Sequence, residues 1–189
     1  DEPAHLLCPA CRAQLRSAPI TTRTPGGRSV TAALGYDGVA ARCIRRVKED
    51  GQTLLTRPLG AALAAVLPAH AHVVPVPTSR EAFRRRGYRV PELLLRRAGR
   101  EPSRVLRVAR RIADQRELGR DERARNVRGS IRAEVRGAGE EVVVVDDVVT
   151  TGATLDEAAA ALETAGFRVI GAIALAATPR RGTPRTRPV

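Results

Sequence analysis

The stretch EVVVVDDVVTTGATLDEAAAALETAG, residues 141–166, decides the fold of this 189-residue chain. Its first nine residues are a nearly continuous β-branched run, which is typical of a strand buried on both faces of a parallel sheet. The small-residue loop TTGAT follows at 150–154, and residues 155–166 have the pattern of a helix that Gly166 ends. The segment therefore predicts a strand, a tight loop and a helix in succession.

The alternation of strands and helices extends through residues 70–177. Short β-branched runs predict strands, and apolar residues at helical spacing predict helices. Strands are expected at 30–36, 72–76, 103–112, 130–135 and 167–177, and further helices at 39–48, 54–67 and 91–99. This order favours an α/β fold with a mainly parallel central sheet flanked by helices.

The expected domain organisation has four parts. Residues 1–18 contain a CPAC turn and form a small separate element. Residues 19–30 are rich in Pro, Gly and Thr and are interpreted as a linker. The α/β domain spans residues 31–178, and residues 179–189 are expected to be a disordered tail.

The composition points to an anionic partner or to arginine-rich codon usage. The formal net charge is +13, and Lys48 is the only lysine. An anionic partner would be phosphate, pyrophosphate or nucleic acid. Two Tyr, two Phe and no Trp argue against a platform that stacks nucleic-acid bases. No apolar run approaches the roughly 20 residues that span a bilayer, so we expect no membrane span and a cytoplasmic location.

The three cysteines, Cys8, Cys11 and Cys43, do not indicate a disulfide framework. Cys8 and Cys11 form a CxxC pair, which could supply two of the four ligands of a structural Zn²⁺. His5, Cys43 or a second CxxC in a preceding stretch could complete the site, and a turn with free thiols is the alternative. Cys43 lies within the helical pattern of residues 39–48, which favours a core position over a ligand role.

Two acids and a small-residue loop follow the valine run. Asp146 and Asp147 stand at the carboxyl end of the expected strand, where ligands bind in open α/β sheets. The loop at 150–154 leads into a helix, so its backbone N–H groups and the helix dipole favour one phosphate. Carboxylates would repel that phosphate but suit sugar hydroxyls, with or without Mg²⁺. The loop is neither a dinucleotide fingerprint nor a P-loop.

These residues resemble the signature of the phosphoribosyltransferase family, which is a β-rich run, two acids and a Thr/Ser-rich loop with one Gly. The resemblance implies a type I phosphoribosyltransferase-like fold. It also implies that Asp146 and Asp147 are the catalytic acids and meet the ribose 2- and 3-hydroxyls of phosphoribosyl pyrophosphate, which Mg²⁺ accompanies. The phosphoribosyl-binding residues that it implies are Asp146, Asp147, Val148, Thr150, Thr151, Gly152, Ala153 and Thr154.

The resemblance also implies a pyrophosphate-binding loop after the strand at 72–76. Its candidate residues are Thr78, Ser79, Arg80 and Arg123. The triple arginine 84–86 either adds charge to this loop or forms a solvated helix face. Residues 113–129 are interpreted as a lid whose arginines, Arg120, Arg123 and Arg125, close over pyrophosphate. The alternative for this segment is a surface helix with acid–arginine pairs at spacing four.

Further segments resemble the ComF group, the competence- and gluconate-linked members of this family. They are LCPACRAQL at 7–15, YDG at 36–38 with Ile44 and Lys48, VVPVPTSREAFRRRGY at 73–88, and the Q-x-x-L…R-x-x-N-V pattern at 115–127. The first segment implies that residues 1–18 are a partial zinc-ribbon-like element with Zn²⁺ at Cys8 and Cys11. Arg89 and Val90 stand where that group usually has Asn–Gln.

Two functions remain open from the sequence. The first is an enzyme that transfers the phosphoribosyl group of phosphoribosyl pyrophosphate and releases pyrophosphate, or a protein that binds such a compound or a nucleotide. The second is a non-catalytic competence or DNA-uptake accessory protein that binds single-stranded DNA or a DNA-processing partner. The N-terminal 70 residues are the only candidate for an acceptor-binding hood. Tyr36 is their sole aromatic residue, so no base pocket is indicated.

Overall fold

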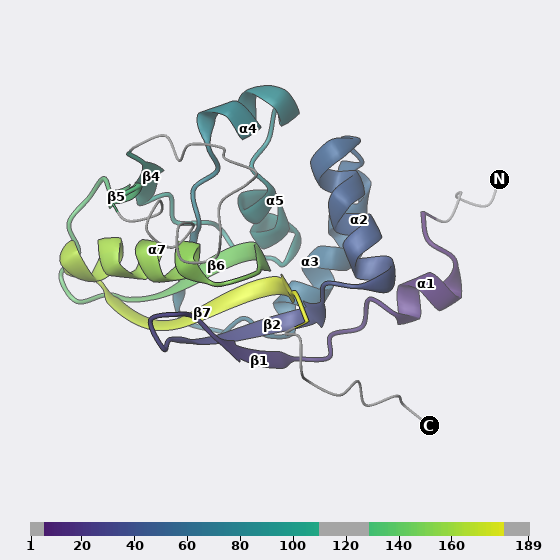
Figure 1. Ribbon diagram of the computed structural model, residues 1–189, viewed down its shortest axis with the longest axis horizontal. Coiled ribbons are helices and arrows are strands. Elements are labelled where there is room, and N and C mark those ends of the chain that lie inside the picture. Colours follow the sequence, from purple (N-terminus) through teal and green to yellow (C-terminus); the bar gives the residue numbers. More distant parts are fainter. Residues whose placement is uncertain (1–5, 110–128, 180–189) are drawn as a thin grey trace.

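A five-stranded sheet forms the centre of the protein in the computed structural model, which describes residues 6–109 and 129–179 (Figure 1). The strand order is β1-β2-β7-β6-β3. The strands are β1 (Ile20–Arg23), β2 (Ser29–Gly35), β3 (His72–Pro75), β6 (Glu141–Val149) and β7 (Arg168–Ala177). β2, β7, β6 and β3 run parallel, and β1 pairs antiparallel with β2 at the edge. The predicted mainly parallel sheet is confirmed.

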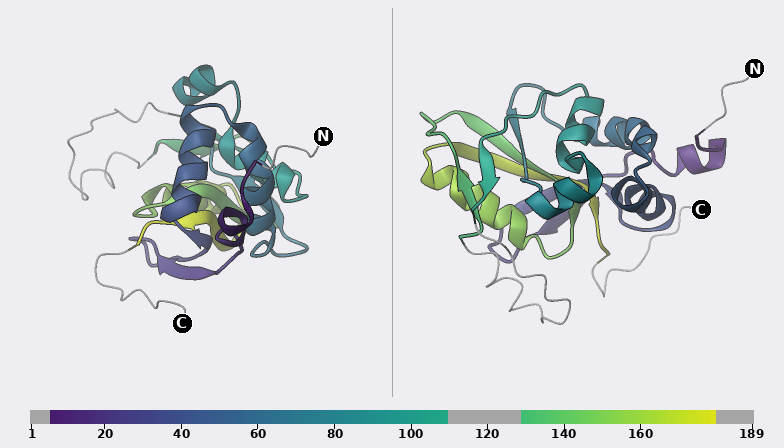
Figure 2. Two further views of the ribbon diagram at one scale, coloured as in Figure 1. Left: turned by 90° about the vertical axis from the view of Figure 1, so that its right-hand side faces the viewer. Right: turned by 90° about the horizontal axis from the view of Figure 1, so that it is seen from above.

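Helices cover both faces of the sheet (Figures 1 and 2). On one face pack α2 (Gly38–Glu49), α3 (Thr56–Ala64) and α5 (Val90–Arg97). On the other face lies α7 (Ala153–Thr164), together with the short antiparallel ribbon of β4 (Leu106–Val108) and β5 (Ile131–Ala133). The three-layer arrangement explains the sequence of β6, because a strand covered on both sides must be apolar on both sides.

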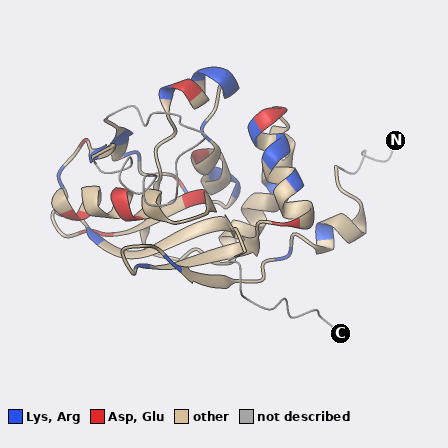
Figure 3. Ribbon diagram, in the orientation of Figure 1, with Lys and Arg blue, Asp and Glu red and all other residues tan. Residues whose placement is uncertain are grey.

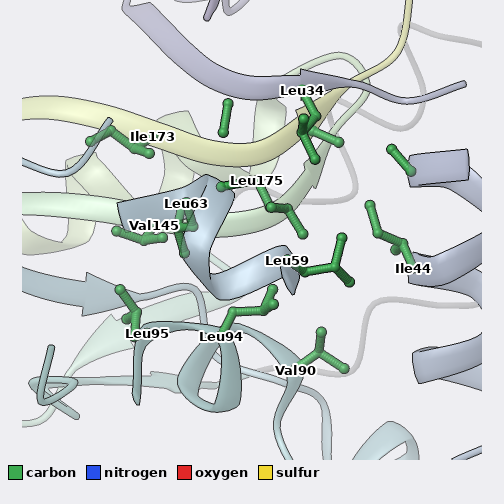
Figure 4. Close-up of a cluster of buried hydrophobic side chains, with 14 of the residues drawn as sticks. Leu34, Ile44, Leu59, Leu63, Val90, Leu94, Leu95, Val145, Ile173 and Leu175 are labelled. Atoms are coloured by element: carbon green, nitrogen blue, oxygen red, sulfur yellow. The ribbon is translucent and has the colours of Figure 1, made fainter. Parts of the chain in front are cut away.

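Alternate residues of β6 build two separate cores. Val143 and Val145 belong to the cluster under α2, α3 and α5, whereas Val142 and Val144 belong to the cluster under α7. Figure 4 shows the first cluster, in which Leu59 and Leu63 of α3 lie close to leucines of α5 and to β7. Cys43 is buried in the same cluster, which confirms its predicted core position.

Residues 19–30 are not the linker that their composition suggests. They form β1 and the turn that joins it to β2, with the Thr24 N–H donating to the carbonyl of Arg28 at 3.0 Å. The segment ITTR at 20–23 is β-branched and suits an edge strand, while Pro25, Gly26 and Gly27 supply the turn. The Pro and Gly residues thus mark a hairpin within the sheet.

Three other elements differ from their predicted extents. The helix expected at 54–67 is a 3₁₀ turn, η1 (Thr53–Leu55), followed by α3. Within the described residues, the strands expected at 103–112 and 130–135 are limited to β4 and β5, which pair with each other and not with the central sheet. The structure adds two short helices, α1 (Pro9–Ala13) and α4 (Arg80–Arg86). Short elements of this kind are set by tertiary contacts more than by local pattern.

Two predicted segments lie largely outside the described residues. They are the lid at 113–129, with Arg120, Arg123 and Arg125, and the tail at 179–189. His5 also lies outside them. In the part of the chain that the structure describes, no helix is both long and apolar enough to cross a membrane.

Candidate functional site

An acid pair lies at the carboxyl end of the central strand β6. Asp146 and Asp147 fall within its last four residues, as predicted. Asp147 is buried, with a relative exposure of 9%, and Asp146 is partly exposed. The backbone N–H of Asp147 donates to Oδ1 of Asp146 at 2.8 Å, which fixes the orientation of the first carboxyl group.

The two carboxyl groups differ in their electrostatic surroundings. Nζ of Lys48 on α2 lies 2.7 Å from Oδ1 of Asp147 and forms an ion pair with it. Burial raises the pKa of Asp146 to about 7, and the nearby Asp147 carboxylate adds to the rise. The hydrogen bond from the Asp147 N–H and the charge of Lys48 act in the opposite direction. The site thus places the Asp147 carboxyl group, paired with Lys48, next to the Asp146 carboxyl group, which takes up a proton near neutral pH.

The loop that follows β6 presents backbone donors at the start of α7. Gly152 is the N-cap, in the left-handed conformation with φ of 88°, and the first intrahelical bond runs from the Asp156 N–H to its carbonyl at 3.0 Å. The Ala153 N–H donates to Oγ1 of Thr151 at 3.3 Å. The N–H groups of Thr154 and Leu155 have no hydrogen-bond partner among the described residues. Such free donors at a helix N-terminus suit an anion.

The β1–β2 hairpin packs against this loop and holds it in place. Oγ1 of Thr24 donates to Oδ1 of Asp156 at 2.6 Å, and the Gly26 N–H donates to Oδ2 of the same carboxylate at 2.8 Å. A Cβ on Gly152 would lie 2.7 Å from Cγ2 of Thr24. Position 152 therefore requires glycine for two reasons, its positive φ and the close approach of Thr24.

The residues predicted to bind pyrophosphate follow the neighbouring strand. β3 pairs in parallel with β6, and the Val76 N–H continues the ladder to the carbonyl of Val145 at 2.8 Å. Thr78, Ser79 and Arg80 come directly afterwards, so they lie at the same edge of the sheet as the acid pair. Ser79 is the N-cap of α4 and accepts from the Ala82 N–H at 3.1 Å.

The arginines predicted to lie near pyrophosphate are found mainly on α4. Arg80 is exposed at the start of α4. The triple arginine 84–86 forms the last turn of this helix, which Gly87 ends in the left-handed conformation. Arg123, the fourth candidate for pyrophosphate binding, lies outside the described residues.

Lys48 is the site residue whose role the sequence did not indicate. The backbone of its helix is held by residues 86–88: Nε of Arg86 donates to the Lys48 carbonyl at 3.0 Å, and the Tyr88 hydroxyl donates to the Val47 carbonyl. Lys48, Arg86 and Tyr88 all occur in the ComF-like segments. However, the contacts of Arg86 and Tyr88 with α2 join positions about 40 residues apart, and the contact of Lys48 with Asp147 joins positions 99 apart. No local pattern could have revealed them.

The cysteine pair lies at α1, far along the molecule from α7 (Figure 1). Cys8 is the N-cap of α1, and its Sγ accepts from the Cys11 N–H at 3.4 Å, a hydrogen bond that lowers the pKa of the Cys8 thiol. Among the described residues, no three His, Cys, Asp or Glu side chains are grouped so that they could hold a metal ion. A Zn²⁺ site at these two cysteines stays a prediction.

The surface has two further features, a set of basic residues on α2 and α4 and a groove beside α7. Figure 3 shows basic residues gathered on α2 and α4, whose ends meet through Arg86 and Tyr88. A groove of about 650 Å³ lies between β5 and the outer side of α7 and includes none of the candidate site residues. Helix α2, unlike the groove, contacts the acid pair, through Lys48 and Asp147.

Comparison with known proteins agrees with the geometry. The phosphoribosyl transferase domain model matches residues 79–188, which is more than half of the chain. The match includes the acid pair, the loop at 150–154 and α4, and it leaves out β1, β2 and α2. A search of curated proteins found no match to this chain.

Proposed function

Because the chain belongs to the phosphoribosyl transferase domain family, we propose that it binds a phosphoribosyl compound, either phosphoribosyl pyrophosphate or a nucleotide. The observation that carries the proposal is the position of two acids near the carboxyl end of the parallel strand β6, which a short loop joins to a helix with Gly152 as its N-cap. Asp146 and Asp147 would accept hydrogen bonds from the ribose hydroxyls. Residues 150–154 would hold the 5-phosphate.

The loop suits a phosphate for electrostatic and steric reasons. The free N–H groups of Thr154 and Leu155 and the positive end of the α7 dipole attract an anion. The hydroxyl groups of Thr150, Thr151 and Thr154 add donors, and Gly152 leaves no side chain in the way. Val148 lies between the acids and the loop and packs against the core. It would thereby fix the backbone between the ribose subsite and the phosphate subsite.

The pyrophosphate group would lie beside the end of β3. Thr78, Ser79 and Arg80 can donate hydrogen bonds to it, and Arg123 is proposed to assist from the lid. Mg²⁺ would bind mainly through ligand oxygens, since it keeps few protein ligands and the described residues form no acidic cage for it. Its charge would offset that of pyrophosphate.

We infer a transfer reaction from the family and from this arrangement. The bond between ribose C1 and the pyrophosphate oxygen would break, a bond from C1 to the acceptor would form, and pyrophosphate would leave with the bonding electrons. The protein would orient the ribose through Asp146 and Asp147 and would stabilise the leaving group through Arg80. No residue needs to form a covalent bond with the substrate.

A pyrophosphate-release assay tests this activity. The protein would be supplied with phosphoribosyl pyrophosphate, Mg²⁺ and single acceptors from a set of bases and amines. The wild type is expected to release pyrophosphate above background with one acceptor. The double variant Asp146→Asn/Asp147→Asn is expected to lose that release. Release that is equal in this double variant would contradict the assignment of the acids.

A ComF-like role is a second candidate, favoured by the basic surface. Arg42, Arg45 and Arg46 of α2 and Arg84 and Arg85 of α4 are exposed (Figure 3). We propose that this surface contacts single-stranded DNA or a competence protein in the cytoplasm, with Cys8 and Cys11 in a Zn²⁺ element. Binding of single-stranded DNA should weaken steeply with salt, because bound phosphates release counterions. A salt-independent affinity would count against this role.

A further inference from the structure

Lys48 makes the one ion pair to the site acids that the described residues contain. Its Nζ lies 2.7 Å from Oδ1 of Asp147, and both side chains are largely withdrawn from solvent, with relative exposures of 25% and 13%. Water screens such a pair less than it screens a surface pair. The contact therefore restrains the Asp147 carboxylate strongly.

Lys48 is itself held in a fixed place. It lies in the last turn of α2, where helix carbonyls lack intrahelical partners. Arg86 and Tyr88 donate to the carbonyls of Lys48 and Val47, so this turn is tied to the chain that follows α4. The ammonium group therefore reaches Asp147 from a backbone that is fixed on the pyrophosphate side of the site.

The type of cation is also informative. The chain has 33 basic residues, and Lys48 is its only lysine. A guanidinium tends to grip both oxygens of a carboxylate through its planar fork, whereas an ammonium is a compact point charge. Here the ammonium contacts Oδ1, and Oδ2 of Asp147 has no hydrogen-bond partner among the described residues. One oxygen thus stays open to accept from a ligand.

We propose that Lys48 is a positioning residue, which orients Asp147 so that its second oxygen receives a ribose hydroxyl. This inference rests on the proposed function, because it concerns how the same site recognises the sugar. It extends the site to α2, which lies outside the matched residues 79–188. Lys48 itself touches neither the sugar nor the phosphate.

Two probe ligands separate this role from a general structural one. Inorganic phosphate occupies the loop at 150–154 alone, whereas ribose 5-phosphate also presents hydroxyl groups to the acids. Calorimetry would compare both ligands in the wild type, Lys48→Met, Asp147→Asn and the double variant. Arg96→Met is the matched control, since it removes an exposed cation of α5 that also pairs with an acid, Glu101, and that belongs to neither proposed binding surface.

Lys48→Met should weaken binding of ribose 5-phosphate roughly tenfold, the usual effect of losing one hydrogen bond to a charged group. Binding of phosphate should stay within about twofold of the wild type, and Arg96→Met should change the binding of neither ligand. In the Asp147→Asn background, Lys48→Met should cause no further loss, because the two residues act as one unit. The double variant removes both charges of the pair, so its binding of the two ligands can be measured even if Lys48→Met alone folds poorly.

Four outcomes would overturn the inference. Unchanged binding of ribose 5-phosphate in Lys48→Met, or equal losses for both ligands, would show that Lys48 does not act through Asp147. Additive losses in the double variant would show the same. A wild type that binds neither ligand would overturn the proposed function, and this inference with it.

Discussion

Thr24 and Asp156, 132 residues apart in the chain, are joined by a hydrogen bond of 2.6 Å between Oγ1 and Oδ1. Thr24 is buried, and the same carboxylate also accepts from the Gly26 N–H. Asp156 stands in the first turn of α7, where a negative charge is stabilised by the helix dipole. The β1–β2 hairpin is therefore part of the structure that supports the start of α7 and the loop at 150–154.

Thr24→Val should lower the free energy of unfolding by about 1–3 kcal/mol, since Oδ1 of Asp156 loses the hydroxyl donor of Thr24 while Oδ2 keeps the Gly26 N–H. Denaturant unfolding checks this value. Thr21→Val is the matched control, because Thr21 is an exposed threonine of the same hairpin, and its change should stay within about 0.5 kcal/mol. Equal stabilities for the two variants would contradict the role of the Thr24–Asp156 bond.

Gly152→Ala should impair both stability and phosphate binding. Its φ of 88° disfavours any side chain, and the new Cβ would meet Thr24. Gly99→Ala is the control for the first effect alone, because Gly99 has a φ of +75° and a Cβ at this position would meet nothing within 4 Å. We expect Gly99→Ala to cost about 1 kcal/mol and to leave phosphate binding intact. A Gly152→Ala variant as stable as Gly99→Ala would argue against the close packing of the hairpin.

The pH dependence of stability should carry a contribution from Asp146. Its carboxyl ionises near pH 4 in an unfolded chain and near pH 7 in the folded protein. Between these values the folded state holds a proton that the unfolded state has lost. The stabilising contribution is therefore complete below about pH 4 and is lost as the pH rises through 7.

Asp146→Asn removes this titration. The difference in free energy of unfolding, variant minus wild type, should therefore be larger at pH 8 than at pH 5. Urea unfolding of both proteins at the two pH values measures the difference. Glu134→Gln, which changes an exposed acid directly after β5, serves as the control. A relative stability that is the same at both pH values would show that the pKa of Asp146 is not raised.

The sequence predicted the strand, loop and helix at 141–166 well, because each of its signals is local. The valine run, the small-residue loop and Gly166 act through their immediate neighbours. The pairing of Lys48 with Asp147 could not be predicted in this way, because it joins residues 99 positions apart through the packing of α2 against the sheet. The composition of residues 19–30 predicts a linker and not the observed hairpin, because Pro and Gly are common both in linkers and in the tight turns of hairpins.

Calorimetric titration with phosphoribosyl pyrophosphate and Mg²⁺ tests the central claim most directly. The wild type would be compared with Asp146→Ala/Asp147→Ala and with Glu140→Ala/Glu141→Ala, which removes two adjacent acids at the opposite end of β6. We expect saturable binding to the wild type and to the second variant. We expect affinity at least roughly a hundredfold lower for the first variant, which loses two hydrogen bonds to charged groups. Equal affinity for all three proteins, with the first variant folded, would contradict the assignment of this site.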